Sequence, residues 1–253
     1  MLEHYVKDRL PQRGILLMTH IVVGHPNFDT SLRLIETMVR AGVDLIELQI
    51  PFSEPIADGP VILRANQEAL SGGATVERCF ELAFQVTRRF DLPFLFMTYY
   101  NVLFRRGVAP FASRMREAGM KGAIVPDLPP EEGADYLEAM TENALAPIFI
   151  FSPNTTSTRM KELARHGRGF IYCVARKGVT GSDTAFSGEL TDYLARARDA
   201  TSLPLAVGFG VKEKRDVDFL RGKADIAVVG SETLRVLDKS GVEGVGTFLK
   251  SLR

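Results

Sequence analysis

The sequence has only two cysteines, Cys79 and Cys173, among its 253 residues. Two cysteines are too few for a disulfide framework or for a metal site built from thiolates. This usage fits a reducing compartment, and we therefore expect a cytoplasmic protein. The four histidines are scattered and form no His-x-x-x-His pair, so the sequence predicts no metal site.

The sequence also lacks an excess of charge and any long apolar run. It has 31 basic and 31 acidic residues, so the formal net charge is zero at pH 7. No positive field attracts phosphate backbones, which disfavours a nucleic-acid-binding function. The apolar runs 146–151 and 226–229 are strand-sized, far below the roughly 20 residues that cross a bilayer. No apolar stretch follows a basic start, so we expect neither a secretory signal nor a membrane protein.

The composition that remains is that of a globular enzyme-sized chain, with 45% hydrophobic and 25% charged residues. Short apolar runs, most of them rich in β-branched or aromatic residues, alternate with amphipathic segments about every thirty residues, the length of a βα unit. Most of the runs lack polar alternation, as expected of parallel strands covered on both faces. We predict eight strands, at Ile15–Val23, Asp44–Ile50, Pro93–Met97, Gly122–Val125, Pro147–Phe151, Gly169–Val174, Pro204–Val207 and Asp225–Val229.

Eight βα units without a linker predict one closed TIM barrel, a (β/α)8 domain that spans residues 1–253. Two helical stretches, 63–70 and 76–89, fit between the second and third strands, so the barrel carries extra helices. An open, doubly wound sheet is the alternative. It is weakened because no Gly-x-Gly-x-x-Gly follows the first strand.

Capping residues predict where several helices begin. Asp29 is expected to cap the helix after the first strand, because its side chain can accept a hydrogen bond from a free backbone amide. Pro110 and Pro130 are expected to begin two later helices, since proline suits the first helical position.

Glu47 stands in a strand whose two faces differ. Leu45, Glu47 and Gln49 share one face of the second strand, and the other face is wholly apolar. The apolar face suits the helix layer, so Glu47 should point into the barrel. A carboxyl group near a strand end in low-dielectric surroundings is suited to general acid–base chemistry. The alternative is a structural glutamate, satisfied by hydrogen bonds or by a basic partner.

The loop 51–60 follows this strand and holds three prolines and one glycine in ten residues, which constrain its shape. Asp58 in this loop either lies over the barrel mouth or acts as a turn or cap residue for a helix that begins at Pro60. His20, in the first strand, either lines the same site or is a core histidine.

Glycines follow the last three predicted strands, in 177–182, in 208–210 and at Gly230-Ser231, where a short helix can begin. Glycine lets backbone amides approach an anion, and a helix N-terminus offers free N–H groups. Loops after the seventh and eighth strands of such barrels commonly hold a phosphate. The sequence therefore predicts a phosphate site. It contains no Gly-x-x-x-x-Gly-Lys-Ser/Thr, which excludes a nucleoside triphosphate P-loop.

These motifs resemble the tryptophan synthase alpha subunit family over nearly the whole chain. The most specific of them is the loop Pro51-Phe52-Ser53 with Ala57-Asp58-Gly59-Pro60, at its spacing from Glu47. Further matches are Met97-Thr98-Tyr99-Tyr100-Asn101, Pro126-Asp127-Leu128-Pro129, Gly178-Val179-Thr180-Gly181, Gly208-Phe209-Gly210 and Gly230-Ser231.

The resemblance implies a TIM barrel that cleaves indole-3-glycerol phosphate to indole and glyceraldehyde 3-phosphate. This retro-aldol reaction needs no metal and no organic cofactor in the chain itself. Glu47 is implied as the acid and base that protonates the indole ring, and Asp58 as the carboxylate that binds the indole N–H. The implied substrate-binding positions are Tyr99, Tyr172, Thr180, Gly181, Phe209, Gly210, Gly230 and Ser231, with the glycines and Ser231 around the phosphate.

The resemblance also implies a partner. The family's alpha subunit docks on a pyridoxal-phosphate-dependent beta subunit, in a heterotetramer of two alpha and two beta subunits, and passes indole to it. A stand-alone lyase and a non-catalytic regulatory subunit are the alternatives. This chain departs from the usual family pattern at Gln49, where Gly is common, and at Glu54, where Asp is common. Gln49 is expected to narrow the indole slot or to hydrogen-bond Glu47.

Overall fold

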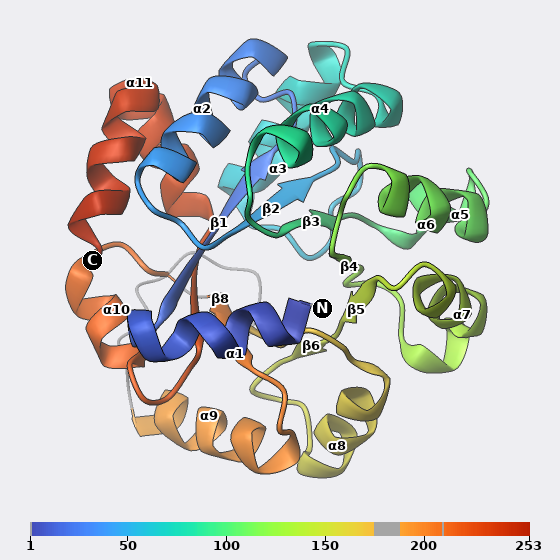
Figure 1. Ribbon diagram of the computed structural model, residues 1–253, viewed down its shortest axis with the longest axis vertical. Coiled ribbons are helices and arrows are strands. Elements are labelled where there is room, and N and C mark those ends of the chain that lie inside the picture. The colour runs from blue at the N-terminus through green and yellow to red at the C-terminus, as the bar shows by residue number, and fades with distance from the viewer. Residues whose placement is uncertain (1, 175–187, 209) are drawn as a thin grey trace.

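The computed structural model describes residues 2–174, 188–208 and 210–253. Within these residues, nine parallel strands form a barrel surrounded by helices (Figure 1). The TIM barrel that the sequence predicts is confirmed, and the open sheet is wrong. The strands are β1 (Leu16–Val22), β2 (Leu45–Gln49), β3 (Phe94–Met97), β4 (Gly122–Ile124), β5 (Ala146–Ile148), β6 (Ile150–Phe151), β7 (Ile171–Val174), β8 (Leu205–Gly208) and β9 (Ile226–Val229).

The fifth predicted strand is divided into two short strands at the place where the barrel closes. The sheet order runs from β5 through β1 to β6, so β5 pairs with β4 and β6 pairs with β7. The carbonyl oxygen of Phe149, between the two pieces, accepts a hydrogen bond from the Tyr172 amide at 2.9 Å. The carbonyl oxygen of Pro147 accepts one from the Arg168 amide at 3.0 Å. These bonds join the two ends of the sheet, and the nine strands correspond to the eight predicted ones.

The outside of the barrel is covered by helices, as its wholly buried strands β1 and β2 require. The extra helix predicted between the second and third strands is confirmed, because α3 and α4 both lie there. The covering helices are α2 (Phe28–Arg40), α3 (Pro60–Ser71), α4 (Val76–Arg89), α5 (Tyr100–Phe104), α6 (Val108–Glu117), α7 (Ala134–Glu142), α8 (Ser157–His166), α9 (Gly188–Ala200), α10 (Lys214–Leu220) and α11 (Ser231–Ser251). Among the described helices, none combines the length and the apolar character that crossing a bilayer requires.

Alternate residues of each strand belong to two different apolar clusters. Ile46 and Leu48 of β2 pack in the outer cluster with the helices, whereas Leu45 packs inside the barrel with Met18 of β1 and Leu95 of β3. The face of β2 that carries Leu45 is therefore the inner one. The inward orientation predicted for Glu47 follows from this alternation.

Two predicted helix starts are wrong in detail. Asn27, not Asp29, caps α2: its side-chain oxygen accepts a hydrogen bond from the Thr30 amide at 2.8 Å. Pro130 begins a short 3-10 turn (Pro130–Glu132), and α7 starts only after Gly133, whose backbone does not continue the turn as an α-helix. In each case two nearby residues can mark the start of the helix: Asn27 or Asp29 for α2, and Pro130 or Gly133 for α7. The path of the folded backbone decides which of the two does so.

Pro110 lies inside the first turn of α6, which begins two residues earlier at Val108. The first amides of a helix have no acceptor within the helix, so a residue without an N–H is tolerated throughout this turn. The proline therefore locates the helix start but does not fix its first residue.

The helix α1 (Leu2–Arg13) lies across the N-terminal end of the barrel (Figure 1). Leu2 and Val6 are its only buried residues, and both pack into the cluster inside the barrel. A helix with so narrow an apolar stripe has little periodicity, which explains why the sequence did not predict it.

Asp44, directly before β2, ties this end of the barrel together. Its side chain is wholly buried, and Oδ2 accepts hydrogen bonds from the Leu17 amide at 2.9 Å and from the Arg253 guanidinium at 2.5 Å. Arg13 of α1 lies 3.4 Å from the other carboxylate oxygen. One buried carboxylate thus joins β1, α1 and the C-terminal residue.

Candidate active site

Glu47 points into the barrel near the carboxyl end of β2, and the predicted orientation is confirmed. His20 of β1 is its neighbour across the strand pair. The side chains of His20 and Glu47 are 5% and 4% exposed, and His20 Nδ1 lies 3.1 Å from Glu47 Oε1. The second oxygen, Glu47 Oε2, is buried and has no hydrogen-bond partner among the described residues. Glu47 therefore keeps one carboxylate oxygen that no described side chain or backbone group satisfies.

The environment of His20 favours its charged form. Burial lowers the pKa of His20, but the negative charge of Glu47 and the direct contact with it outweigh burial, so the pKa of His20 is raised above its usual value. The imidazole therefore keeps a proton to higher pH than a histidine in water. The sequence left His20 open between a site residue and a core residue, and the structure places it beside Glu47.

Asp58 lies at the same mouth and does not cap α3. Gly59 precedes that helix, and Asp58 Oδ2 instead accepts a hydrogen bond from Gln49 Nε2 at 2.6 Å. Burial raises the pKa of Asp58, although the hydrogen bond from Gln49 and the charge of His20 oppose this effect. Asp58 is therefore a partly buried carboxyl group whose proton affinity is tuned by its neighbours.

The predicted hydrogen bond between Gln49 and Glu47 is wrong, because Gln49 donates to Asp58. Residues two apart on a strand face lie roughly 6.6 Å apart along it. Gln49 is the last residue of β2, so its amide is nearer the loop that carries Asp58 than Glu47 is.

Tyr99 and Asn66 hold this loop against the barrel. The amide of Ala57 donates to the Tyr99 hydroxyl oxygen at 3.0 Å, and the amide of Phe52 donates to Asn66 Oδ1 at 2.9 Å. The ring of Phe52 stacks on that of Tyr99, with centroids 5.1 Å apart. Burial and the neighbouring Asp58 raise the pKa of Tyr99, so its hydroxyl stays neutral. Tyr99 thus contacts the loop that carries Asp58 through both its hydroxyl group and its ring.

Tyr172 reaches the same site from β7. A Cβ at position 208 would lie 2.3 Å from Tyr172 Cε1, so Gly208 makes room for the ring. Burial raises the pKa of Tyr172 well above its usual value, and the charges of Glu47 and Asp58 add to this effect. The aromatic ring therefore lies within the field of both carboxyl groups.

Two of the three predicted phosphate elements, at Gly208 and Gly210 at the end of β8 and at Gly230-Ser231 after β9, lie at the same rim of the barrel. The pairing of β9 with β1 brings Gly230 level with His20, and Ser231 is the first residue of α11. Gly210 has a φ of 59°, which is the left-handed region that favours glycine. Open space surrounds the positions where a Cβ of residues 210 and 230 would stand. Three predicted site residues, Thr180, Gly181 and Phe209, lie outside the described residues.

The sequence placed Gln49 beside the site and left His20 open, but it did not predict the contacts of His20 with Glu47 and of Gln49 with Asp58. Strand alternation was the available signal, since it places both on inner faces near strand ends. Within the described ranges, no group of three or more His, Cys, Asp or Glu side chains is arranged to hold a metal ion.

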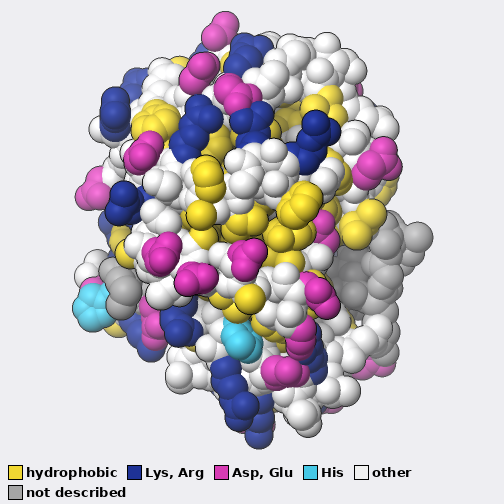
Figure 2. Space-filling view, turned by 90° about the vertical axis from the view of Figure 1, so that its right-hand side faces the viewer, with side chains coloured by type: hydrophobic (Ala, Val, Ile, Leu, Met, Phe, Trp, Pro, Cys, Tyr) yellow, Lys and Arg dark blue, Asp and Glu magenta, His cyan; other side chains and the backbone are white. Residues whose placement is uncertain are grey.

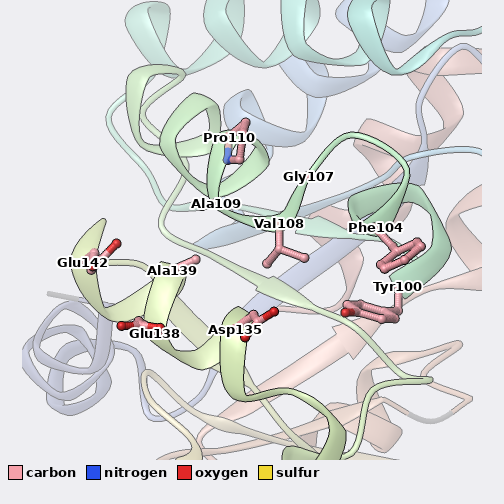
Figure 3. Close-up of a pocket in the computed structure, with 10 residues that line it drawn as sticks. All are labelled: Tyr100, Phe104, Gly107, Val108, Ala109, Pro110, Asp135, Glu138, Ala139 and Glu142. Carbon is pink, nitrogen blue, oxygen red and sulfur yellow. The ribbon is translucent and has the colours of Figure 1, made fainter.

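A separate groove of about 560 Å³ lies between α5, α6 and α7 (Figure 3). Tyr100, Phe104 and Val108 line it on one side, and Asp135 and Glu138 of α7 line it on the other. Figure 2, which shows the right-hand side of Figure 1, displays apolar side chains gathered at the centre of the face and acidic ones beside them. Two large apolar residues are exposed in the segments that follow β2 and β3. Ile56, in the loop after β2, is 71% exposed, and Phe104, at the end of α5, is 65% exposed.

The sequence matches the family described as tryptophan synthase alpha chain over residues 7–247. The chain belongs to this family. It is 66% identical to the tryptophan synthase alpha chain of Desulforapulum autotrophicum over 252 residues, with 100% of each chain covered. It is 62% identical to that of Syntrophotalea carbinolica over 253 residues, again with 100% of each covered. The resemblance drawn from the motifs is confirmed, and the chain is a lyase of the tryptophan synthase alpha type.

The fold supports the same assignment. A solved structure of tryptophan synthase from Mycobacterium tuberculosis superposes on this chain with a TM-score of 0.93 at 29% identity. The superposition covers 99% of this chain and 96% of that chain.

Proposed function

We propose that this chain cleaves indole-3-glycerol phosphate to indole and glyceraldehyde 3-phosphate, with Glu47 as the acid and base. The observation that carries the proposal is the buried Glu47 at the barrel mouth, with Oε2 open and Asp58 nearby. Protonation of the indole ring by Glu47, at the carbon that bears the side chain, makes the ring an electron acceptor. The Glu47 carboxylate then accepts the proton of the side-chain hydroxyl, the carbon–carbon bond breaks, and its electron pair returns to the ring.

Asp58 has a different role in this scheme. As a carboxylate it accepts a hydrogen bond from the indole N–H and stabilises the positive charge that the ring gains on protonation. Two carboxyl groups in unlike environments thus divide the work, one exchanging protons and the other remaining ionised. Tyr172 and Tyr99 border the space beside them and supply aromatic surface for the indole ring.

The substrate's phosphate is proposed to bind at Gly210, Gly230 and Ser231. The N-terminus of α11 begins at Ser231, and its free N–H groups and dipole favour an anion. The proposal includes Gly181 and Phe209 in the same cradle, and Thr180 as the substrate-binding loop residue that closes on Asp58. Binding energy from the phosphate, remote from the bond that breaks, positions the indole ring between the two carboxyl groups.

A charge introduced at position 230 tests the proposed phosphate site. Replacing Gly230 by Asp should raise the KM for indole-3-glycerol phosphate by about 2- to 30-fold, because an anion is then fixed at the helix N-terminus, where a charge is worth about 0.3–2 kcal/mol. Gly230→Asn is the matched control, since it has the same shape without the charge. Steady-state kinetics of indole release measure both. Equal KM values for the two variants would contradict a phosphate at this helix.

We further propose that the chain docks on a pyridoxal-phosphate-dependent beta subunit, in a heterotetramer of two alpha and two beta subunits in the cytoplasm. The exposed Ile56 and Phe104 support a docking face at the rim, because exposed apolar side chains of this size are typical of interfaces. The chain's own reaction needs no cofactor, because both proton transfers are assigned to Glu47.

The deciding experiment is an indole-release assay with indole-3-glycerol phosphate, with and without a purified pyridoxal-phosphate-dependent beta subunit of tryptophan synthase. We expect slow release from the chain alone and a sharp rise with the beta subunit. Fast turnover alone would indicate a stand-alone lyase. Complex formation without any indole release would indicate a regulatory subunit and would refute the proposed chemistry.

A further inference from the structure

We propose that His20 and Gln49 are positioning residues, each of which holds one of the two carboxyl groups of the site. His20 holds Glu47 by one oxygen and leaves the other directed at the substrate, and Gln49 holds Asp58 against the end of β2. This inference rests on the proposed function, because it concerns the same two carboxyl groups.

His20 is well placed to fix Glu47. It lies on β1, whose seven residues are all buried, and it is the direct neighbour of Glu47 across the strand pair. A free glutamate side chain samples many rotamers, and the 3.1 Å contact between His20 Nδ1 and Glu47 Oε1 selects one of them. Oε2 then has a defined position, which proton transfer to a ring carbon requires.

The same contact stabilises the negative charge that Glu47 gains during the reaction. When Glu47 gives its proton to the indole ring, its carboxylate forms beside an imidazole that retains a proton to higher pH than usual. An ionised partner at this distance stabilises the carboxylate until the hydroxyl proton returns to it.

A purely structural pair does not explain the unsatisfied oxygen. Glu47 Oε2 is buried without a hydrogen-bond partner in the described part of the chain. Buried polar atoms left unpaired destabilise a fold, and an apolar pair of similar volume would avoid that cost. Open polar atoms at a barrel mouth are expected where a substrate supplies the missing partners.

Gln49 acts on Asp58 in a similar way. The Gln49 side chain is buried at the end of β2, and its amide donates to Asp58 Oδ2 at 2.6 Å. The amide carries no charge, so it fixes a loop carboxylate to the rigid strand without neutralising it. The hydrogen bond also favours the ionised form and counteracts the effect of burial on the pKa of Asp58.

Variants of His20 test whether this residue positions Glu47. His20→Phe removes the donor, and we expect kcat to fall about 100-fold, the scale of a misplaced catalytic group, with KM within about threefold. His20→Asn keeps an N–H donor near the position of Nδ1 and should retain kcat within about tenfold of the wild type. Met18→Leu, on the same face of β1 one layer deeper, is the control and should leave kcat unchanged. Wild-type kcat in His20→Phe, or equal losses in Phe and Asn, would overturn the role of His20.

The pH dependence of kcat/KM tests whether Gln49 positions Asp58. Asp58 must be ionised, so kcat/KM falls as the pH drops through its pKa. Gln49→Met keeps the length of the side chain but removes the donor, which raises the pKa of Asp58 and should move this acid limb to higher pH. The groups that face Asp58 besides Gln49 are His20, Glu47 and Tyr99, and all three are retained. An acid limb at the wild-type position would overturn the role of Gln49.

If a His20 variant fails to fold, an NMR titration still tests the contact between His20 and Glu47. Nitrogen-15 NMR of the four histidines follows the titration of His20 in the intact chain, and Glu47→Gln should move its midpoint to lower pH. An unchanged midpoint would refute the contact. An inactive wild type would refute the proposed function, whereas an active wild type with wild-type kinetics in His20→Phe and Gln49→Met would refute only the positioning roles.

Discussion

Glu47→Gln should lower kcat for indole release by about 10²–10⁴-fold, the usual contribution of a general acid or base. The amide has nearly the shape of the carboxyl group, and its oxygen can still accept a hydrogen bond from His20. It can neither give nor take a proton at neutral pH. The change therefore removes the chemistry and leaves the site in place, so substrate binding should stay within about threefold.

Single-turnover kinetics measure the loss, and calorimetric titration of the inactive variant with indole-3-glycerol phosphate measures binding. Glu117→Gln, which removes an exposed carboxyl group at the end of α6, is the control and should behave as the wild type. A Glu47→Gln enzyme with wild-type kcat would show that the buried glutamate is structural. That alternative is real, because His20 does give Glu47 the basic partner that a structural glutamate needs.

Asp44→Ala should cost about 3–5 kcal/mol of unfolding free energy, the range for breaking a buried ion pair. The change leaves the Arg253 guanidinium and the Leu17 amide without their acceptor, and it frees α1 from the barrel end. Such a loss is a large part of the 5–15 kcal/mol that stabilises a typical domain. Urea unfolding, followed by circular dichroism, measures it.

Arg9→Ala is the matched control for Asp44→Ala. Arg9 lies 3.9 Å from the same carboxylate, but its side chain is 39% exposed. Its removal should cost less than about 1 kcal/mol. Asp44 precedes β2 and lies at the end of the barrel opposite the site, so folded Asp44→Ala protein should keep the wild-type KM. A loss of stability below about 1 kcal/mol would refute the anchoring role of Asp44.

The strand order, the inward face of the second strand and the glycine-bearing strand ends could all be predicted from the sequence, as could most of the covering helices. These features depend on alternation and on residue types that act over a few neighbours, as with Leu45 and Glu47 on one face. The closed barrel followed because eight parallel units leave few other ways to bury both faces of every strand.

The contacts within the site were not contained in that local pattern. The tertiary structure alone decided that Gln49 reaches Asp58, that His20 faces Glu47, and that the fifth strand divides where the sheet closes. Each depends on strand register or on the path of a loop, which join residues far apart in the chain. Periodicity reports which face a side chain occupies, and only the folded backbone fixes which distant atom that side chain meets.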